Sequence, residues 1–157
     1  MKVKKIPPIN QMEPWYGKEE KKAILEYLDS GGWLTEFKKT EEFERMICEY
    51  TGAKYCSVVS NGTVSLFLAL KALGVKYGDE VVVPDYTMIA TPNAVLMAGA
   101  KPVFVDIDDS LCLDLELVKK AITNKTKAII HVSINGRAGD LKGLKRLCRD
   151  KNIHLIE

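Results

Sequence analysis

Short runs rich in Val and Ile alternate with helical segments through most of this chain, and that alternation restricts the folds open to it. The predicted strands cover residues 55–59, 80–83, 102–105, 128–132 and 153–156. The predicted helices lie between them, at residues 63–73, 90–98, 115–122 and 141–149, with Asp114 and Asp140 as N-caps and Gly74 and Gly99 as stops. Strands separated by helices pair in parallel. The sequence therefore predicts an α/β fold, a mostly parallel sheet with flanking helices.

Two further helices are predicted ahead of the first strand. One contains Ala23, Ile24, Tyr27 and Leu28 and is halted by residues 30–32; the other starts near Thr40, with Phe43, Met46, Ile47 and Tyr50 as its buried face. We expect residues 1–50 to be a helical segment that packs on a larger domain formed by residues 51–157.

Composition excludes several classes of partner. The chain has 157 residues, 46% of them apolar, and a net charge of +2 with both signs interleaved, so no nucleic-acid partner is indicated. No two cysteines form Cys-x-x-Cys, so neither a zinc site nor a redox pair is indicated. No run approaches the roughly 18 apolar residues that cross a bilayer, and the first residues lack the apolar core of a signal peptide. We predict a cytoplasmic protein without membrane or metal partners.

The turn at Asn61-Gly62-Thr63 is the strongest candidate for a binding site. It follows an apolar run and opens a helix whose Leu66, Leu70 and Leu73 form one apolar stripe. The first amides of a helix have no internal partner and lie at the positive end of its dipole, so a small-residue turn there favours a phosphate. An ordinary capped βα turn gives the same pattern. The dinucleotide and nucleoside-triphosphate fingerprints, Gly-x-Gly-x-x-Gly and the Walker lysine, are absent from this turn.

Several motifs in collinear order resemble one known family. They are Gly78–Pro84, Thr87–Thr91, Gly99–Asp106, the turn within Ser60–Leu66, Lys125–Ile130, and Ser30–Thr35 with Phe43-Glu44. Together they resemble the DegT/DnrJ/StrS family of nucleotide-sugar aminotransferases over nearly the whole chain. The resemblance implies the N-terminal part of the large domain of a type I, aspartate aminotransferase-like fold that binds pyridoxal 5′-phosphate (PLP).

The resemblance also implies roles for individual residues in cofactor binding. The amides of Gly62 and Thr63, with the Thr63 hydroxyl, would hold the cofactor's phosphate, and Asn61 would shape the turn. Met88 stands where the family usually carries an aromatic ring stacked on the pyridine. A polarizable thioether can lie against that face, although a lone Met is by default a core residue.

Three residues are weaker candidates for substrate contacts. Trp33 and Thr35 fall in the family's N-terminal signature near the substrate cleft, where a core Trp and a capping Thr would serve equally well. Arg137 follows Asn135-Gly136 and could meet a carboxylate or phosphate through its planar fork, or lie on the surface. We interpret His131 and His154 as structural.

No catalytic residue is assigned within the chain. The family implies a Schiff-base lysine and an acidic partner for the pyridine nitrogen, both expected beyond Glu157. For the complete protein the resemblance implies a homodimer that transfers an amino group from glutamate or glutamine to a nucleotide-linked keto sugar, in polysaccharide, lipopolysaccharide or antibiotic-sugar synthesis. The alternatives are a PLP- or PMP-dependent sugar dehydratase of the same family, or a truncated, inactive remnant serving at most as a binding or dimerisation module.

Overall fold

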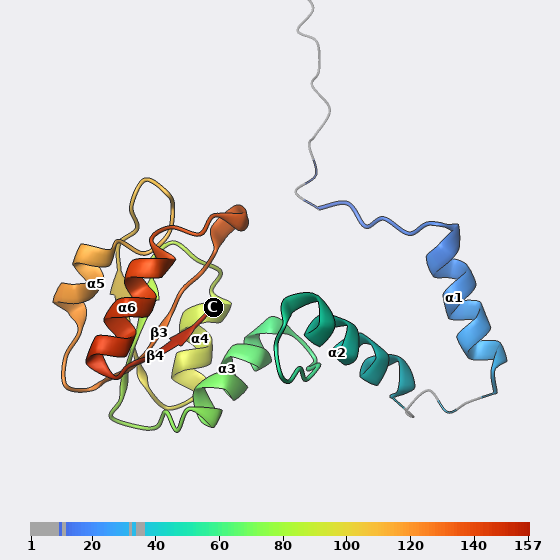
Figure 1. Cartoon of the computed structure of the whole chain (residues 1–157), viewed down its shortest axis with the longest axis horizontal. Coiled ribbons are helices and arrows are strands. Elements are labelled where there is room, and N and C mark those ends of the chain that lie inside the picture. The colour runs from blue at the N-terminus through green and yellow to red at the C-terminus, as the bar shows by residue number, and fades with distance from the viewer. Residues whose placement is uncertain (1–9, 11, 32, 34–36) are drawn as a thin grey trace, which may run out of the picture. The chain divides into compact units, whose positions relative to one another are not determined.

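The computed structural model describes the chain except for residues 1–9, 11, 32 and 34–36 (Figure 1). It divides into two compact units, Met1–Val58 and Val59–Glu157. The packing of residues 1–50 on a larger domain stays a prediction. Among the described residues, no helix combines the length and the apolar character needed to cross a bilayer.

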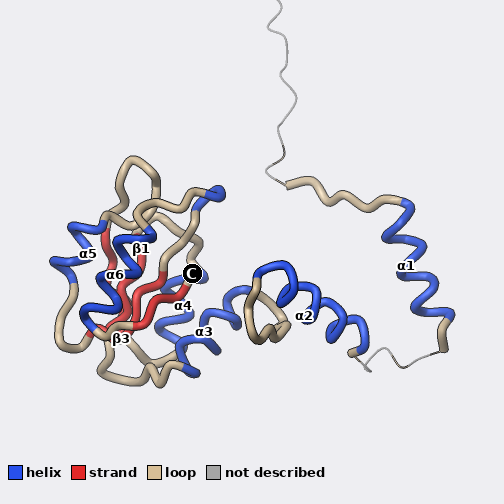
Figure 2. Tube along the Cα trace, in the orientation of Figure 1, coloured by secondary structure: helices blue, strands red, loops and turns tan. Residues whose placement is uncertain are grey.

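The second unit contains a four-stranded parallel sheet in the order β2-β1-β3-β4. Figure 2 shows its strands in red with helices beside them. Its strands are β1 (Glu80–Pro84), β2 (Lys101–Val105), β3 (Thr126–Ile130) and β4 (His154–Ile156). Val82 pairs with Val103 on one side of β1 and with Ile129 on the other. The predicted parallel α/β architecture is confirmed, with β3 beginning and ending two residues earlier than the sequence indicated.

Helices cover both faces of this sheet because side chains of a buried strand alternate between its faces. Val81 and Val83 belong to a core shared with α3 (Gly62–Ala72) and α4 (Ala90–Met97). Val82 and Ile129 belong to a second core shared with α5 (Leu115–Ala121) and α6 (Leu141–Lys151). The unit is therefore a three-layer sandwich.

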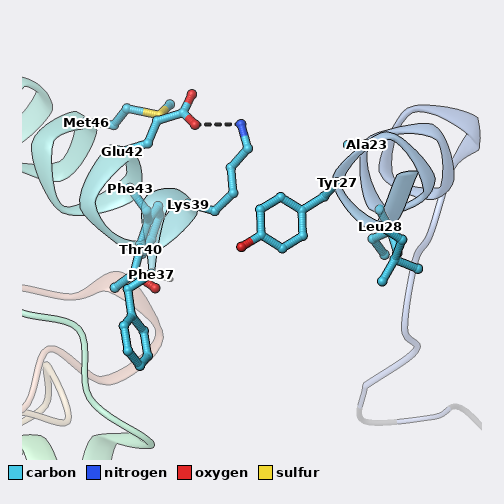
Figure 3. Close-up of a pocket in the computed structure, with 10 residues that line it drawn as sticks. Ala23, Tyr27, Leu28, Phe37, Lys39, Thr40, Glu42, Phe43 and Met46 are labelled. Carbon is cyan, nitrogen blue, oxygen red and sulfur yellow. Dashed lines mark hydrogen bonds and ion pairs between the residues drawn. The ribbon is translucent and has the colours of Figure 1, made fainter. Parts of the chain in front are cut away.

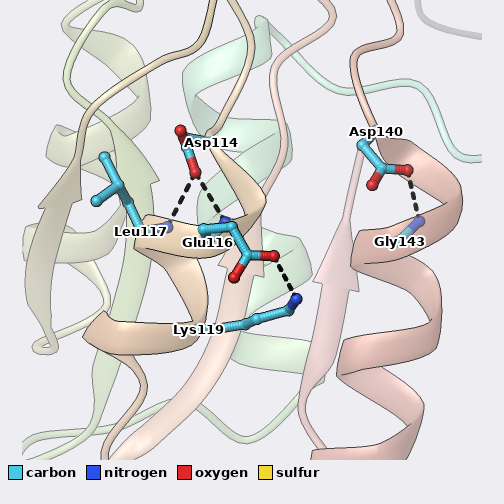
Figure 4. A network of polar contacts seen from close by, with 6 residues as sticks. All are labelled: Asp114, Glu116, Leu117, Lys119, Asp140 and Gly143. Carbon is cyan, nitrogen blue, oxygen red and sulfur yellow. Dashed lines mark hydrogen bonds and ion pairs between the residues drawn. The ribbon is translucent and has the colours of Figure 1, made fainter.

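The predicted caps of α5 and α6 are confirmed (Figure 4). Asp114 Oδ1 accepts hydrogen bonds from the amides of Glu116 at 2.7 Å and Leu117 at 3.0 Å. Asp140 Oδ1 accepts from the Gly143 amide at 2.9 Å. Each carboxylate satisfies orphan amides and lies at the positive end of the helix dipole.

The predicted strand at residues 55–59 is wrong. The structure assigns no strand there, and residues 55–59 pair with none of the four strands. The Val58 amide donates instead to the Glu44 carboxylate, at 2.7 Å. An alternating apolar run needs a neighbouring strand to complete its backbone hydrogen bonds, and the described residues offer none.

The first unit contains α1 (Lys18–Asp29) and α2 (Lys38–Thr51), as the sequence predicted, but neither helix has a buried residue. The predicted buried face of α2 is therefore wrong as a description of this unit: Phe43, Met46 and Tyr50 are all more than half exposed. The two helices line a hollow of about 570 Å³ (Figure 3). It contains the ion pair between Lys39 and Glu42, and none of the candidate site residues lines it.

Candidate functional site

The carboxyl edge of the parallel sheet is where an α/β sandwich places ligands, because the loops that follow the strands gather there. Three loops of the second unit begin at this edge, at residues 85–89, 106–114 and 131–140. The start of α3 belongs to the same edge, since α3 precedes β1 through a short connection and runs back along the sheet. The loops that carry Met88 and Arg137 therefore leave the sheet at this edge, and the topology places the Asn61–Thr63 turn at the same end of the unit.

The Asn61–Thr63 turn opens α3 as predicted. The Asn61 side chain accepts a hydrogen bond from the Val64 amide at 3.0 Å, and its carbonyl accepts from the Ser65 amide at 3.1 Å. The amides of Gly62 and Thr63, which lie between Asn61 and Val64, make no hydrogen bond within the described part of the chain. A Cβ added at Gly62 would meet nothing within 4 Å.

These observations test whether the turn fits a phosphate. Two amides without partners project from the first turn of an eleven-residue helix, where its dipole is positive. The space over Gly62 is open, and Thr63 adds a half-buried side chain whose hydroxyl makes no hydrogen bond to the described residues. The donor set and the open approach fit a phosphate group.

Met88 lies in the loop between β1 and α4 and is 72% exposed. The core alternative for this residue is therefore wrong. The loop around it is ordered by the hydroxyls of Thr87 and Thr91, which lie 2.9 Å apart, and Thr91 is buried. An exposed thioether beside an ordered helix start is available to the flat face of a ligand. Tyr86, half exposed in the same loop, offers a second surface.

Arg137 lies in the loop after β3, and its side chain is exposed. Within the described residues it makes no ion pair, so its guanidinium is available to an anion. A residue of the loop after β2 contacts this loop: Cys112 Sγ donates a hydrogen bond to the Arg137 carbonyl at 3.4 Å. Gly139, at a φ of 53°, is close enough to Cys112 that a Cβ there would meet the Cys112 Cβ at 2.6 Å.

The loop after β2 is ordered by its own polar residues. The hydroxyl and the amide of Ser110 both donate to Asp108, and the hydroxyl bond in particular lowers the pKa of that carboxyl. Leu111 adopts a positive φ of 63° so that Cys112 can pair back with Asp108 through its carbonyl, at 2.9 Å. This loop supports the Arg137 loop rather than contributing a reactive group.

The N-terminal candidates are not brought to this edge by any described contact. Trp33 is 76% exposed, so the interpretation of Trp33 as a core residue is wrong, and its substrate role stays a prediction. Thr35 lies outside the described residues.

His131, at the carboxyl end of β3, has a feature that sequence reasoning missed. It is only 2% exposed, and neither ring nitrogen has a hydrogen-bond partner among the described residues. Burial lowers its pKa, which the Glu157 carboxylate partly opposes and Lys145 reinforces. The sequence does show a histidine at the end of an apolar strand, which indicates burial. Nothing in that pattern indicates that the ring nitrogens lack hydrogen-bond partners. His154, by contrast, is exposed.

A parallel α/β sandwich with unpaired amides at a helix start on its carboxyl edge defines a class of proteins that take phosphate-bearing ligands there. Within that class, the model of the DegT/DnrJ/EryC1/StrS aminotransferase family matches residues 14–157, and the chain belongs to this family. The family and the fold predicted from the sequence are thus confirmed.

Individual relatives agree with this assignment. The chain is 41% identical over 146 residues to GDP-perosamine synthase of Vibrio cholerae, covering 92% of this chain and 40% of that protein. Among solved structures, S. venezuelae DesV is similar with a TM-score of 0.82 at 38% identity, covering 87% of this chain and 37% of DesV. The PLP form of a Streptococcus pneumoniae sugar aminotransferase gives 0.83 at 34% identity, covering 92% of this chain and 37% of that one. The chain thus spans about two fifths of the length of these relatives.

Proposed function

We propose that this chain is the cofactor-binding part of a PLP-dependent aminotransferase that transfers an amino group from glutamate or glutamine to a nucleotide-linked keto sugar. The observation that carries the proposal is the pair of unpartnered amides at Gly62 and Thr63, under open space at the start of α3. Membership of an aminotransferase family, and similarity to a GDP-perosamine synthase and a PLP-form sugar aminotransferase, support it. The complete protein is proposed to act as a cytoplasmic homodimer.

Each candidate residue has a defined part in this proposal. The Gly62 and Thr63 amides and the Thr63 hydroxyl donate to the phosphate, and the α3 dipole stabilises its charge. The Met88 thioether contacts the ring. Arg137 presents a planar fork to a carboxylate or phosphate of the substrate. When bound, the cofactor supplies an electron sink for the amino-transfer chemistry.

We further propose that no lysine of this chain anchors the cofactor covalently. The three loops at the carboxyl edge, residues 85–89, 106–114 and 131–140, contain no lysine. Borohydride reduction of the chain after mixing with PLP, followed by peptide mapping, is expected to mark no unique lysine. Stoichiometric reduction onto one lysine would contradict this part of the proposal.

An absorbance titration of the chain with PLP tests the binding site. Gly62→Ala places a methyl group where the phosphate would approach and, because a Cβ there meets nothing of the protein, leaves the fold unchanged. Thr63→Val removes one hydrogen bond from a hydroxyl to a charged group, which is worth about 1.5–3 kcal/mol, and the methyl group of Gly62→Ala obstructs the approach of the phosphate. We therefore expect each variant to weaken binding roughly tenfold or more.

Ser65→Ala is the matched control, because Ser65 is an exposed residue two positions beyond the turn, on α3. Pyridoxal, which lacks the phosphate, controls for aldehyde chemistry at surface lysines. Binding that is lost with pyridoxal and weakened at Gly62 supports the proposal. Failure of the unaltered chain to bind PLP, or equal binding by all variants, would favour the remnant alternative.

A further inference from the structure

Two of the four cysteines come close together only in the folded chain. Cys48 lies in α2 and Cys56 lies in the segment that follows it, and both are free and half-buried. Their separation in the sequence matches no redox or metal motif, which is why the sequence did not single them out. Cys112 and Cys148, in the other unit, are buried.

The chain reverses direction between these two cysteines through a defined set of hydrogen bonds. The Gly52 amide, at a φ of 74°, donates to the Cys48 carbonyl at 2.9 Å and ends α2. The Thr51 hydroxyl donates to the Ile47 carbonyl at 2.7 Å and accepts from the Ala53 amide at 3.2 Å. These bonds direct the following residues back along α2.

The returning segment is then fixed to the helix a few residues later. The Val58 amide donates to Glu44 Oε1 at 2.7 Å. Cys48 lies one helical turn from Glu44 toward the reversal, a rise of about 6 Å. Cys56 lies two residues from Val58 in the same direction, and two residues of chain reach at most about 7 Å. The two spans match, so Cys56 returns to the level of Cys48.

The electrostatics agree with this juxtaposition. Burial raises the pKa of the Cys56 thiol, and the neighbouring Cys48 and Glu44 raise it further. Cys48 is thus within electrostatic range of Cys56. The Cys48 thiol lies on the side of α2 that carries Glu44, since residues four apart share a helix face, and Glu44 also acts on Cys56.

We propose that Cys48 and Cys56 form a reversible intramolecular disulfide when the chain meets a small-molecule disulfide such as glutathione disulfide. One protein thiolate attacks a glutathione sulfur and releases one glutathione thiolate. The second protein thiolate attacks the protein sulfur of that mixed disulfide, which forms the Cys48–Cys56 bond and releases the second glutathione. Two protein thiols are oxidised and one glutathione disulfide is reduced to two thiols, so the exchange balances.

The reaction has an expected pH dependence, because the thiolate and not the thiol is the nucleophile. A raised pKa leaves Cys56 mostly protonated at neutral pH. We expect the rate of disulfide formation to rise as the pH increases. Glu44, on α2, is the charged group beside Cys56, and its negative charge opposes thiolate formation.

Equilibration of the reduced 157-residue chain in glutathione buffers of graded ratio tests the proposal. After alkylation of the remaining thiols, we expect a loss of two hydrogen masses, two alkylated cysteines, and a peptide that links Cys48 to Cys56. Cys48→Ser and Cys56→Ser should each abolish that loss. Alkylation of all four thiols at every ratio, mixed glutathione disulfides without the internal link, or links between separate molecules would overturn the proposal.

A second pair of variants tests the geometry directly. Glu44→Ala removes the acceptor that fixes Val58, so we expect half-oxidation to shift toward a higher proportion of glutathione disulfide. Glu41→Ala, an exposed carboxylate nearer the start of α2, is the control and should not shift it. Equal helix content by far-UV circular dichroism would show that both variants fold. An unchanged ratio in Glu44→Ala would overturn the anchored geometry on which the proposal depends.

Discussion

At the scale of single residues, the buried His131 ring makes stability depend on pH. Both ring nitrogens lack partners, and burial holds the folded-state pKa below the ordinary value of 6.5. In the window between those two values, the unfolded chain binds a proton that the folded chain does not. The stabilisation from a neutral His131 is therefore complete above pH 6.5 and is lost as the pH falls toward the folded-state pKa.

We predict that the free energy of unfolding of the chain decreases below about pH 6.5, and that His131→Phe reduces this decrease. Phenylalanine keeps a ring of similar size and removes both unpaired nitrogens. Denaturant unfolding followed by far-UV circular dichroism at several pH values measures the effect. His154→Gln, at an exposed position, should keep the pH dependence of the unaltered chain. Identical slopes with pH in His131→Phe and the unaltered chain would contradict the prediction.

At the scale of elements, the contact between α5 and α6 depends on the absence of a side chain at Gly143. A Cβ at this position would lie 2.5 Å from Leu115 Cδ2, and it would also collide with the Asp140 carboxylate that caps α6. Replacing a helical glycine by alanine usually stabilises a protein by about 0.5–1 kcal/mol. Here we expect the collision to outweigh that gain, because two side chains, Leu115 and Asp140, must move together and the Asp140 carboxylate also caps α6.

We predict that Gly143→Ala destabilises the chain by about 1–3 kcal/mol. Lys142→Ala, at the neighbouring exposed position, should change stability by less than about 0.5 kcal/mol. Urea unfolding of the three proteins compares them. A Gly143→Ala variant that is more stable than the unaltered chain would show that the two helices move apart without cost.

The sequence predicted these elements well where their partners are present in the unit. Four of the five predicted strands formed, with ends displaced by at most two residues, since short Val- and Ile-rich runs between helices have few other folds open to them. The predicted strand at residues 55–59 did not form, because a hydrophobic pattern indicates that a segment can form a strand but not whether a neighbouring strand is present to pair with it. For the same reason, the pattern predicted α2 but not the exposure of Phe43 and Met46.

In the candidate site too, the features that depend on neighbouring residues were predictable from the sequence, and those that depend on distant residues were not. The turn at Asn61 follows from local chemistry, a capping side chain before a helical stripe, and the sequence predicted it. The surroundings of Met88 and His131 depend on which loops lie over them, and residues distant in the sequence decide that. Resemblance to a family supplied what the local pattern lacked, namely a role for the turn.

At the scale of the whole molecule, the two units differ in how much they bury. In the second unit, four of the five residues of β1 and of β3 are buried, whereas no residue of α1 or α2 is buried. Local opening costs least where few apolar contacts must be broken. Opening free energies should therefore be far from uniform along the chain.

We predict that hydrogen exchange will be slowest at residues 81–83 and 128–130 and fast at residues 55–59, apart from the Val58 amide bonded to Glu44. The experiment requires a concentration at which light scattering shows a monomer, because the apolar residues 55–59, which have no strand beside them, can pair with another copy. Mass spectrometry of proteolytic fragments after brief labelling gives the comparison. Equal protection of residues 55–59 and β1 in the monomer would contradict the structure.

The strand order β2-β1-β3-β4 has a consequence for synthesis on the ribosome. The first strand of the sheet to be translated, β1, takes an interior position between β2 and β3. β2 and β3 therefore pair with opposite edges of β1 as they emerge, and β4 then pairs with the free edge of β3. Growth outward from an early centre keeps each pairing step short in sequence and limits the time for which apolar strand edges stay uncovered during translation.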